Sequence, residues 1–147
     1  MTNQDDVRAT GRRLWRAWTD MWNRSPEIAE AIVGDSFTLH ATTPVAGIES
    51  IRDGRAVRAW VTAFRAPFAK LVFQIAEPFV DIERQIAVGP WIGEAELLAG
   101  GGRRTCGIDL LRFEGPRIVE VWTTSKETTD EDTIARWRNR DTAPADR

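Results

Sequence analysis

Residues 107–122 read GIDLLRFEGPRIVEVW. Two runs rich in β-branched and large apolar side chains flank the short segment Glu114–Arg117, which contains a glycine and a proline. A turn of this composition between two extended runs predicts a hairpin of antiparallel strands. In the simplest register of this hairpin, Phe113 lies opposite Ile118.

The register of the hairpin determines which side chains share a face. In a regular antiparallel ladder counted from the turn, Leu111 lies opposite Glu120, and Asp109 lies opposite Trp122 on the same face. The sequence therefore predicts a carboxylate beside an indole on an otherwise apolar side of the sheet.

The hairpin is predicted to end a longer antiparallel meander. Extended runs cover about 70–81, 85–99, 104–114 and 117–126, with turn segments between them. The three glycines at 100–102 are interpreted as a hairpin turn, because a phosphate-binding loop needs a helix directly after it.

Helical patterns precede the meander. Residues 5–23 carry one apolar stripe, 25–34 predict a short second helix that Gly34 closes, and a third helix follows Asp53 and ends before Pro67. A strand is predicted over 37–45, and acidic residues before arginines predict a terminal helix over 128–140. Helices segregated from a curved antiparallel sheet define an α+β fold.

The length and composition favour one compact unit. The chain has 147 residues, 42% of them hydrophobic and 29% charged, which predicts a single domain over 1–147 with an ordered core of about 5–138. The formal net charge is −2, so the basic surface that nucleic-acid phosphates require is missing. We expect no nucleic-acid partner.

Rare residue types narrow the chemistry further. Cys106 is the only cysteine, His40 is the only histidine, and tyrosine is absent. An internal disulfide, a thiolate metal cluster and a multi-histidine metal site are therefore excluded, and a free thiol suits a reducing cytoplasm. No apolar run approaches the roughly 20 residues of a membrane span. We expect a cytoplasmic protein without membrane contact, cofactor or metal.

Four segments together resemble a known family. They are Trp18-x-x-x-Trp22-Asn23, Gly47-Ile48, residues 107–115 and residues 117–122. They look like the SnoaL-like branch of the nuclear-transport-factor-2-like superfamily. The resemblance implies a curved antiparallel sheet with three N-terminal helices around a cone-shaped pocket, and a homodimer formed through the outer sheet face. Its members include polyketide cyclases, epoxide hydrolases, steroid isomerases, dehydratases and proteins that only bind.

The chain departs from the motifs of that family. Where the late strand of the family commonly has His-Trp-Asp, this chain has Val121-Trp122-Thr123. Polyketide cyclases carry a catalytic acid a few residues later, where only Glu127 is acidic here. Steroid isomerases and limonene-type epoxide hydrolases use tyrosines, so their complete sites are not present.

Asp109 and His40 are the predicted catalytic residues. A carboxyl group on an apolar face should have a raised pKa, as a general acid or base near neutral pH requires. The alternative is a structural acid that backbone amides or Arg112 satisfy. His40 is the natural proton shuttle, or else a structural or exposed histidine. If the two side chains meet across the pocket, they form an acid/base dyad.

Aromatic side chains are predicted to form the ligand-binding surface. The residues are Trp15, Trp18, Trp22, Trp60, Trp91, Trp122 and Phe64. The alternative is that these rings fill the core. Along the second long strand, either Trp91 or the pair Glu94 and Glu96 lines the cavity, because alternate residues point to opposite faces.

Two functions remain open on this sequence. The first is an enzyme that performs cofactor-free cyclisation, epoxide opening or isomerisation on a hydrophobic, oxygen-bearing small molecule such as a polyketide. The second is a non-catalytic module of the same fold that binds a small molecule or a protein. Arg112 and Glu120 are expected to stabilise the hairpin or a dimer face, and Cys106 is expected to be structural.

Overall fold

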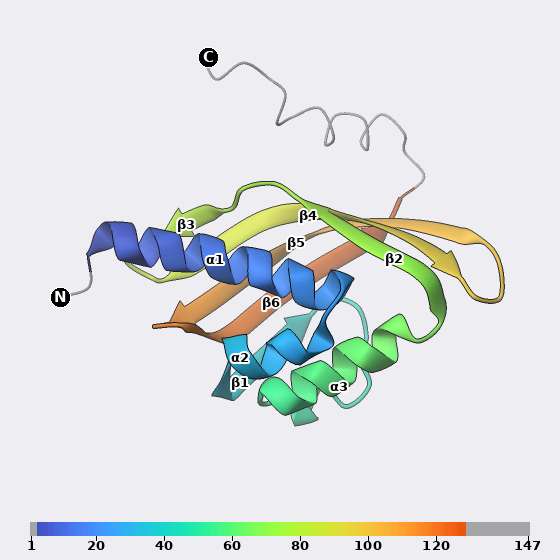
Figure 1. Cartoon of the computed structure of the whole chain (residues 1–147), viewed down its shortest axis with the longest axis horizontal. Coiled ribbons are helices and arrows are strands. Elements are labelled where there is room, and N and C mark those ends of the chain that lie inside the picture. The colour runs from blue at the N-terminus through green and yellow to red at the C-terminus, as the bar shows by residue number, and fades with distance from the viewer. Residues whose placement is uncertain (1–2, 129–147) are drawn as a thin grey trace, which may run out of the picture.

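The computed structural model describes residues 3–128 (Figure 1). Its helices are α1 (Gln4–Asn23), α2 (Ala29–Ile32) and α3 (Gly54–Arg65), with short 3₁₀ turns at Pro26–Ile28 and Ile48–Ser50. Its strands are β1 (Val33–Ala41), β2 (Phe68–Ile75), β3 (Phe79–Asp81), β4 (Ile86–Leu97), β5 (Gly102–Glu114) and β6 (Arg117–Glu127). The helix predicted over 128–140 falls, beyond Thr128, outside the described residues.

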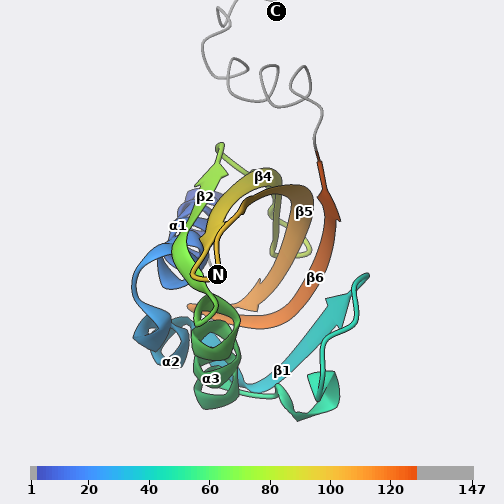
Figure 2. The same ribbon diagram turned by 90° about the vertical axis from the view of Figure 1, so that its right-hand side faces the viewer.

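The strands form one curved sheet in the order β1-β6-β5-β4-β2, and β3 pairs with β4. The predicted antiparallel meander is confirmed, although its first run is divided into β2 and β3. The early strand β1 joins the sheet parallel to β6, so the described sheet has one parallel pair at its edge. Figure 2 shows the sheet curling, with α1 and α3 at the open side of the curl.

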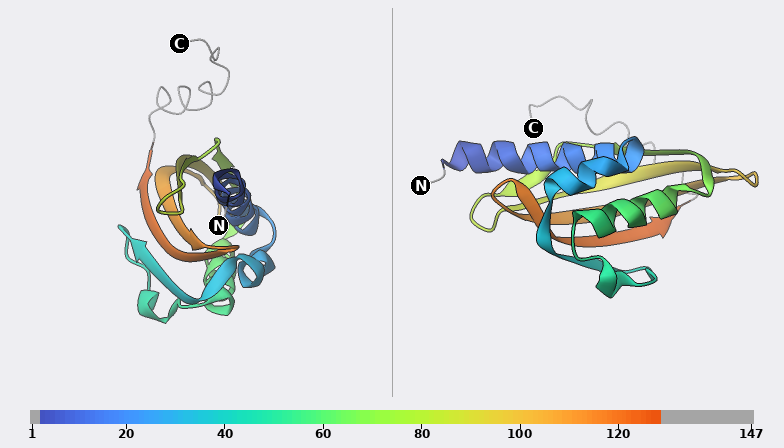
Figure 3. Two further views of the ribbon diagram at one scale, coloured as in Figure 1. Left: turned by 90° about the vertical axis from the view of Figure 1, so that its left-hand side faces the viewer. Right: turned by 60° about the horizontal axis from the view of Figure 1, so that its bottom comes forward.

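Helix α1 lies along the concave side of the sheet because its apolar stripe must be buried. Leu14, Trp15, Trp18 and Met21 are all buried. The side chain of Asn3 caps the helix by accepting a hydrogen bond from the Asp5 amide at 3.2 Å. All three helices lie on the same side of the sheet (Figure 3), which confirms the predicted α+β architecture.

The second predicted helix is shorter than expected. The chain leaves α2 at Ile32 and enters β1 at Val33, so Gly34 lies within the strand and does not close the helix. A methyl group on Gly34 would come within 3.2 Å of a Val119 methyl carbon on β6. Glycine at this position allows a close approach of the two strands. In the sequence, a glycine of this kind cannot be told from one that ends a helix.

The predicted register of the last hairpin is only half right. Phe113 lies opposite Ile118 as predicted, but the next pair is Arg112 with Glu120, so Val119 forms a one-residue bulge. Asp109 consequently faces Thr123, and Leu111 faces Val121. The bulge has a packing reason: Ile118 and Val121 are three residues apart, and a regular strand could not bury both in the same core.

Asn23 fastens the end of α1 to the edge strand β2. Its side-chain amide donates to the carbonyl oxygen of Phe73 at 2.9 Å, and its side-chain oxygen accepts from the Phe73 amide at 2.7 Å. These two bonds replace the ladder partner that an edge strand lacks on that side. The position of α1 over the sheet therefore depends in part on one side chain.

We expect Asn23→Ala to lower the free energy of unfolding by about 1–2 kcal/mol, because both hydrogen bonds to Phe73 are lost. Arg24→Ala is the matched control: it removes an exposed ion pair to Asp20, and such pairs contribute little. Urea unfolding of both variants measures the difference. Equal losses in the two variants would contradict the role given to Asn23.

Candidate functional site

A cavity of about 560 Å³ lies between the concave sheet, α1 and α3. Its wall is mostly apolar and aromatic. Its residues are Trp15, Trp18, Thr19, Trp22, Ala41, Thr43, Pro44, Val45, Ala46, Trp60, Ala63, Phe64, Phe68, Leu71, Phe73, Ile75, Trp91, Ala95, Arg103, Thr105, Asp109, Thr123 and Ser125. This size and lining suit a drug-sized organic ligand.

Asp109 is the buried acid of the cavity, with 8% of its surface exposed. Its Oδ1 accepts hydrogen bonds from Thr123 Oγ1 at 2.6 Å and from Trp91 Nε1 at 2.9 Å. Its Oδ2 accepts from Trp18 Nε1 at 3.1 Å. Donors from β6, β4 and α1 thus converge on one carboxyl group of β5.

The two oxygens of Asp109 are not equivalent. A carboxylate oxygen offers two lone pairs, and both of those on Oδ1 are used by described partners. Oδ2 has one described partner, Trp18, and keeps a second lone pair. Oδ2 is therefore the atom on which a proton can be held or released without breaking the network.

Burial raises the pKa of Asp109 above its ordinary value of 3.8. The hydrogen bonds from Thr123, Trp91 and Trp18 act in the opposite direction because they stabilise the carboxylate, but they do not outweigh the loss of hydration. No described cation pairs with Asp109. The alternative of an acid neutralised by Arg112 is wrong, because Arg112 binds Glu120 and Glu114.

Gly107 leaves the space that Trp91 needs to reach Asp109. Trp91 lies opposite Gly107 in the ladder, and a Cβ atom at Gly107 would come within 2.5 Å of the Trp91 ring. The indole therefore lies across β5 at this point, and its N–H reaches the carboxyl group two residues further along. The glycine also accommodates the Thr124 carbonyl oxygen, which would lie 2.0 Å from a Cβ atom, so a close approach by backbone and by Trp91 excludes a side chain here.

Trp22 is the centre of the aromatic wall. Its ring contacts those of Trp60, Phe64 and Phe73 edge-on, with centroid distances of 4.9, 5.2 and 5.8 Å. Trp18 lies 6.4 Å away in a similar orientation. Edge-to-face packing holds the rings in fixed positions, so the wall is formed before a ligand enters.

The structure places six of the seven predicted ligand-binding aromatics at the cavity. Trp15, Trp18, Trp22, Trp60, Phe64 and Trp91 all line it. Trp122 does not, because the bulge at Val119 pairs it with Leu110 and points it to the outer face. The sequence allowed either Trp91 or the pair Glu94 and Glu96 to face the cavity. The structure places Trp91 at the cavity, and Glu94 and Glu96 border a second groove.

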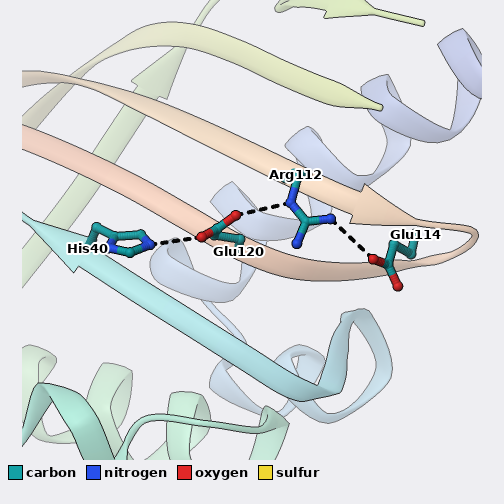
Figure 4. Close-up of polar contacts among 4 residues, drawn as sticks. All are labelled: His40, Arg112, Glu114 and Glu120. Atoms are coloured by element: carbon teal, nitrogen blue, oxygen red, sulfur yellow. Dashed lines mark hydrogen bonds and ion pairs between the residues drawn. The ribbon is translucent and has the colours of Figure 1, made fainter. Parts of the chain in front are cut away.

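The structure does not bring His40 and Asp109 together. His40 lies on the outer face, where it stacks on Trp122 at 4.4 Å, and its Nε2 is 2.9 Å from Glu120 Oε2. Glu120 also accepts from Arg112 Nε at 3.0 Å (Figure 4). The predicted dyad is therefore wrong, since the alternation of β1 buries its neighbour Leu39 and turns His40 away.

The outer network fixes the charge of Glu120. Its partial burial would raise its pKa, but hydrogen bonds from His40 and Arg112 more than compensate and hold the pKa below the ordinary 4.5. These contacts agree with the prediction that Arg112 and Glu120 stabilise the hairpin. They leave the chemistry of the cavity to other residues.

Six polar residues of the cavity are not among the predicted site residues: Thr19, Thr43, Arg103, Thr105, Thr123 and Ser125. The contact between Thr123 and Asp109 could not be predicted, because a regular hairpin pairs Asp109 with Trp122. Arg103 and Thr105 are an even number of residues from Asp109 on the same strand, so they face the same side of the sheet. This alternation could have predicted them from the sequence. Among residues 3–128, no three histidine, cysteine, aspartate or glutamate side chains are grouped as a metal site.

The described helices include none long and apolar enough to span a membrane. No protein-family model matches the sequence, and no curated protein matches it. The likeness to known proteins is therefore one of structure.

The curved sheet with helices over an apolar cavity is the fold of SnoaL-like proteins in the nuclear-transport-factor-2-like superfamily, as the resemblance predicted. A proposed polyketide cyclase from Acidithiobacillus ferrooxidans matches at a TM-score of 0.66 and 19% identity, over 91% of this chain and 96% of that chain. A pinacolase from Penicillium brevicompactum matches at 0.62 and 13%, over 96% and 97% of the two chains. A SnoaL-like polyketide cyclase, also a proposed one, from Jannaschia sp. CCS1 matches at 0.64 and 11%, over 92% and 94%.

We expect the stability of the wild type relative to Asp109→Asn to fall as the pH rises above 3.8, the ordinary aspartate pKa. Above that pH the unfolded chain releases its proton, whereas the folded protein keeps it until the pH passes the raised pKa, so unfolding becomes progressively easier. Urea unfolding between pH about 4 and about 8 measures this difference. The contribution of Glu120 to the pH dependence is the same in both proteins, so it cancels in the difference between their unfolding free energies. A difference that is independent of pH would contradict the raised pKa.

Proposed function

We propose that the protein is an enzyme that performs cofactor-free acid/base chemistry on a hydrophobic, oxygen-bearing small molecule such as a polyketide. The observation that carries this proposal is Asp109, a buried carboxyl group with a raised pKa and a free lone pair on Oδ2 at an aromatic cavity. A carboxyl group in such surroundings is suited to proton transfer near neutral pH.

One carboxyl group suits reactions in which a proton is removed and later returned. In a cyclisation, Oδ2 takes a proton from a carbon next to a carbonyl group, the resulting enolate forms a carbon–carbon bond to a second carbonyl, and the new alkoxide recovers the proton from Oδ2. In epoxide opening, Oδ2 takes a proton from water as the oxygen of that water attacks an epoxide carbon, the carbon–oxygen bond of the ring breaks, and the new alkoxide takes the proton back from Oδ2. Neither route needs His40.

The surrounding residues hold Asp109 ready for this task. Two indole N–H groups and one hydroxyl group keep the carboxyl group in one orientation, so little reorganisation is needed when its charge changes. The aromatic wall provides an apolar surface for the hydrocarbon part of the substrate beside this carboxyl group. Polyketide cyclases and a pinacolase among the structural neighbours support a reaction of this kind.

We expect Asp109→Asn to reduce turnover at least about a hundredfold, because an amide cannot accept and return the proton. Asp20→Asn on the exposed side of α1 is the matched control and should leave the rate unchanged. The assay follows consumption of polyketide-like diketones and epoxides by mass spectrometry. If Asp109 acts first as a base, kcat/KM rises with pH through its raised pKa. Full turnover by Asp109→Asn would overturn the proposal.

A second candidate function is a module that binds a small molecule without converting it. The absence of the usual histidine and acid beside Trp122 favours this candidate, since Val121 and Thr123 occupy their positions. The same assay separates the two functions. Binding of these compounds without conversion by the wild type would favour the binding module.

We also propose that two copies associate through the outer sheet face. Ile108 on β5 and Trp122 on β6 lie on this face with 49% and 43% of their surfaces exposed. Adjacent exposed apolar side chains of this size support an interaction surface.

Ile108→Lys is expected to convert the dimer to a monomer in sedimentation-velocity measurements, because a buried ammonium group would oppose the contact. Leu98→Lys is the matched control, since Leu98 is 69% exposed and lies beyond the end of β4. A monomeric wild type, or equal effects of both substitutions, would contradict the proposed interface.

A further inference from the structure

Arg103 is a charged cavity residue to which the proton-transfer reaction gives no role. It lies near the start of β5, and its side chain shares a face with Asp109 because the two are an even number of residues apart on one strand. Among the described residues, Arg103 and Asp109 are the two charged residues that line the cavity. Asp109 is buried at the deep end, whereas Arg103 is exposed at the open end.

Arg103 has no described partner for its charge. The arginines Arg16, Arg24, Arg58, Arg84 and Arg112 all form ion pairs with carboxylates. Within residues 3–128, Arg103 makes no hydrogen bond or ion pair. An unpaired guanidinium group beside an apolar cavity is available for a planar anion such as a carboxylate, which it can bind with two parallel hydrogen bonds.

No acidic residue close to Arg103 in the described ladder forms an ion pair with it. Glu127 pairs with Thr105, and together with Glu94 and Glu96 it borders a second groove that meets the cavity at Arg103 and Ala95. Within residues 3–128, none of these carboxylates forms an ion pair with Arg103. The chain as a whole carries a net charge of −2. A preference of the cavity for anions would therefore come from Arg103 itself and not from the overall charge.

Hydroxyl groups line the wall between the two charges. Thr105 lies between Arg103 and Asp109 on β5, and Ser125 lies opposite Gly107 on β6. Within the described part of the chain, neither hydroxyl group has a hydrogen-bond partner. These polar groups lie along one wall, which the Trp91 ring interrupts at Gly107, and the wall around Trp22 is apolar.

The strand sets the distance between the charged ends. Asp109 lies six positions after Arg103, and a strand rises about 3.3 Å per residue, so their backbones lie roughly 20 Å apart along the strand. The arginine side chain can extend several ångströms along this path. A ligand that reaches both groups is therefore elongated, of the size of two or three fused rings with a side chain.

We propose that Arg103 binds an anionic group of the ligand, so that the substrates are elongated, apolar acids whose carboxylate lies at the open end and whose reacting carbon lies at Asp109. This inference rests on the proposed function, because it assumes that the cavity holds the substrate. The ligand lies with its ring faces toward the aromatic wall and its oxygen atoms toward Thr105 and Ser125. Arg103 determines specificity and takes no part in proton transfer.

The test compares 1-pyrenebutanoate with 1-pyrenebutanol, which share a skeleton and differ in charge. Binding is measured at pH about 7.5, where the acid is ionised, by energy transfer from the tryptophans to pyrene. We expect the wild type to bind the acid about tenfold more tightly than the alcohol, and this preference to decrease with added salt. Arg103→Gln should bind both compounds equally.

Arg104→Gln is the matched control. Arg104 is the next residue along β5, it faces away from the cavity, and it should keep the preference of the wild type for the acid. Equal binding of both compounds by the wild type, or loss of the preference in Arg104→Gln as well, would overturn the inference and leave the acid/base proposal intact. If the wild type bound neither compound, this inference would be overturned, and the turnover assay of Asp109→Asn would still decide the acid/base proposal.

Discussion

Hydrogen bonds to one buried carboxyl group constrain how helix α1 and three strands lie around the cavity. Asp109 on β5 receives hydrogen bonds from Trp18 on α1, Trp91 on β4 and Thr123 on β6. A carboxylate without these donors would be expensive to bury, so the helix and the three strands must hold their relative positions. The same contacts leave Oδ2 with a free lone pair, so the arrangement that satisfies the acid also keeps it reactive.

The one-residue bulge at Val119 decides which side chains share the cavity with Asp109. Beyond it, Thr123 points inward and donates to Asp109, and Trp122 points outward and stacks on His40. In a regular strand these residues would exchange faces. A packing requirement near the turn, the burial of both Ile118 and Val121, thus determines the composition of the site several residues away.

The sequence predicted the fold well because its signals are local. The stripe on residues 5–23 and the turn at Glu114–Arg117 each specify an element without reference to the rest of the chain. Asp109 was also found from sequence, although by a register that proved wrong beyond Phe113. The bulge could not be predicted because it depends on the packing of β6 against the rest of the core. The sequence of the hairpin alone does not contain that information. The sequence also does not determine which residues of β1 face the cavity, so the predicted position of His40 was wrong.

The energetic cost of the cavity argues for function. An aspartate held away from water lowers stability at neutral pH compared with an apolar residue of similar volume. Within residues 3–128, the hydroxyl groups of Thr105 and Ser125 have no hydrogen-bond partner and Arg103 has no ion pair, so these groups form no polar contact that stabilises the described fold. Arg103, Thr105 and Asp109 lie on β5 and Ser125 lies on the adjacent strand β6, so all four line the same wall. The aromatic rings opposite them hold one another in place by edge-on contacts. Stability alone would favour apolar residues at the buried position of Asp109 and the half-buried positions of Thr105 and Ser125. The alternation of polar groups along one wall is accounted for by a ligand that carries several oxygen atoms along one edge, with Asp109 and Arg103 at its two ends.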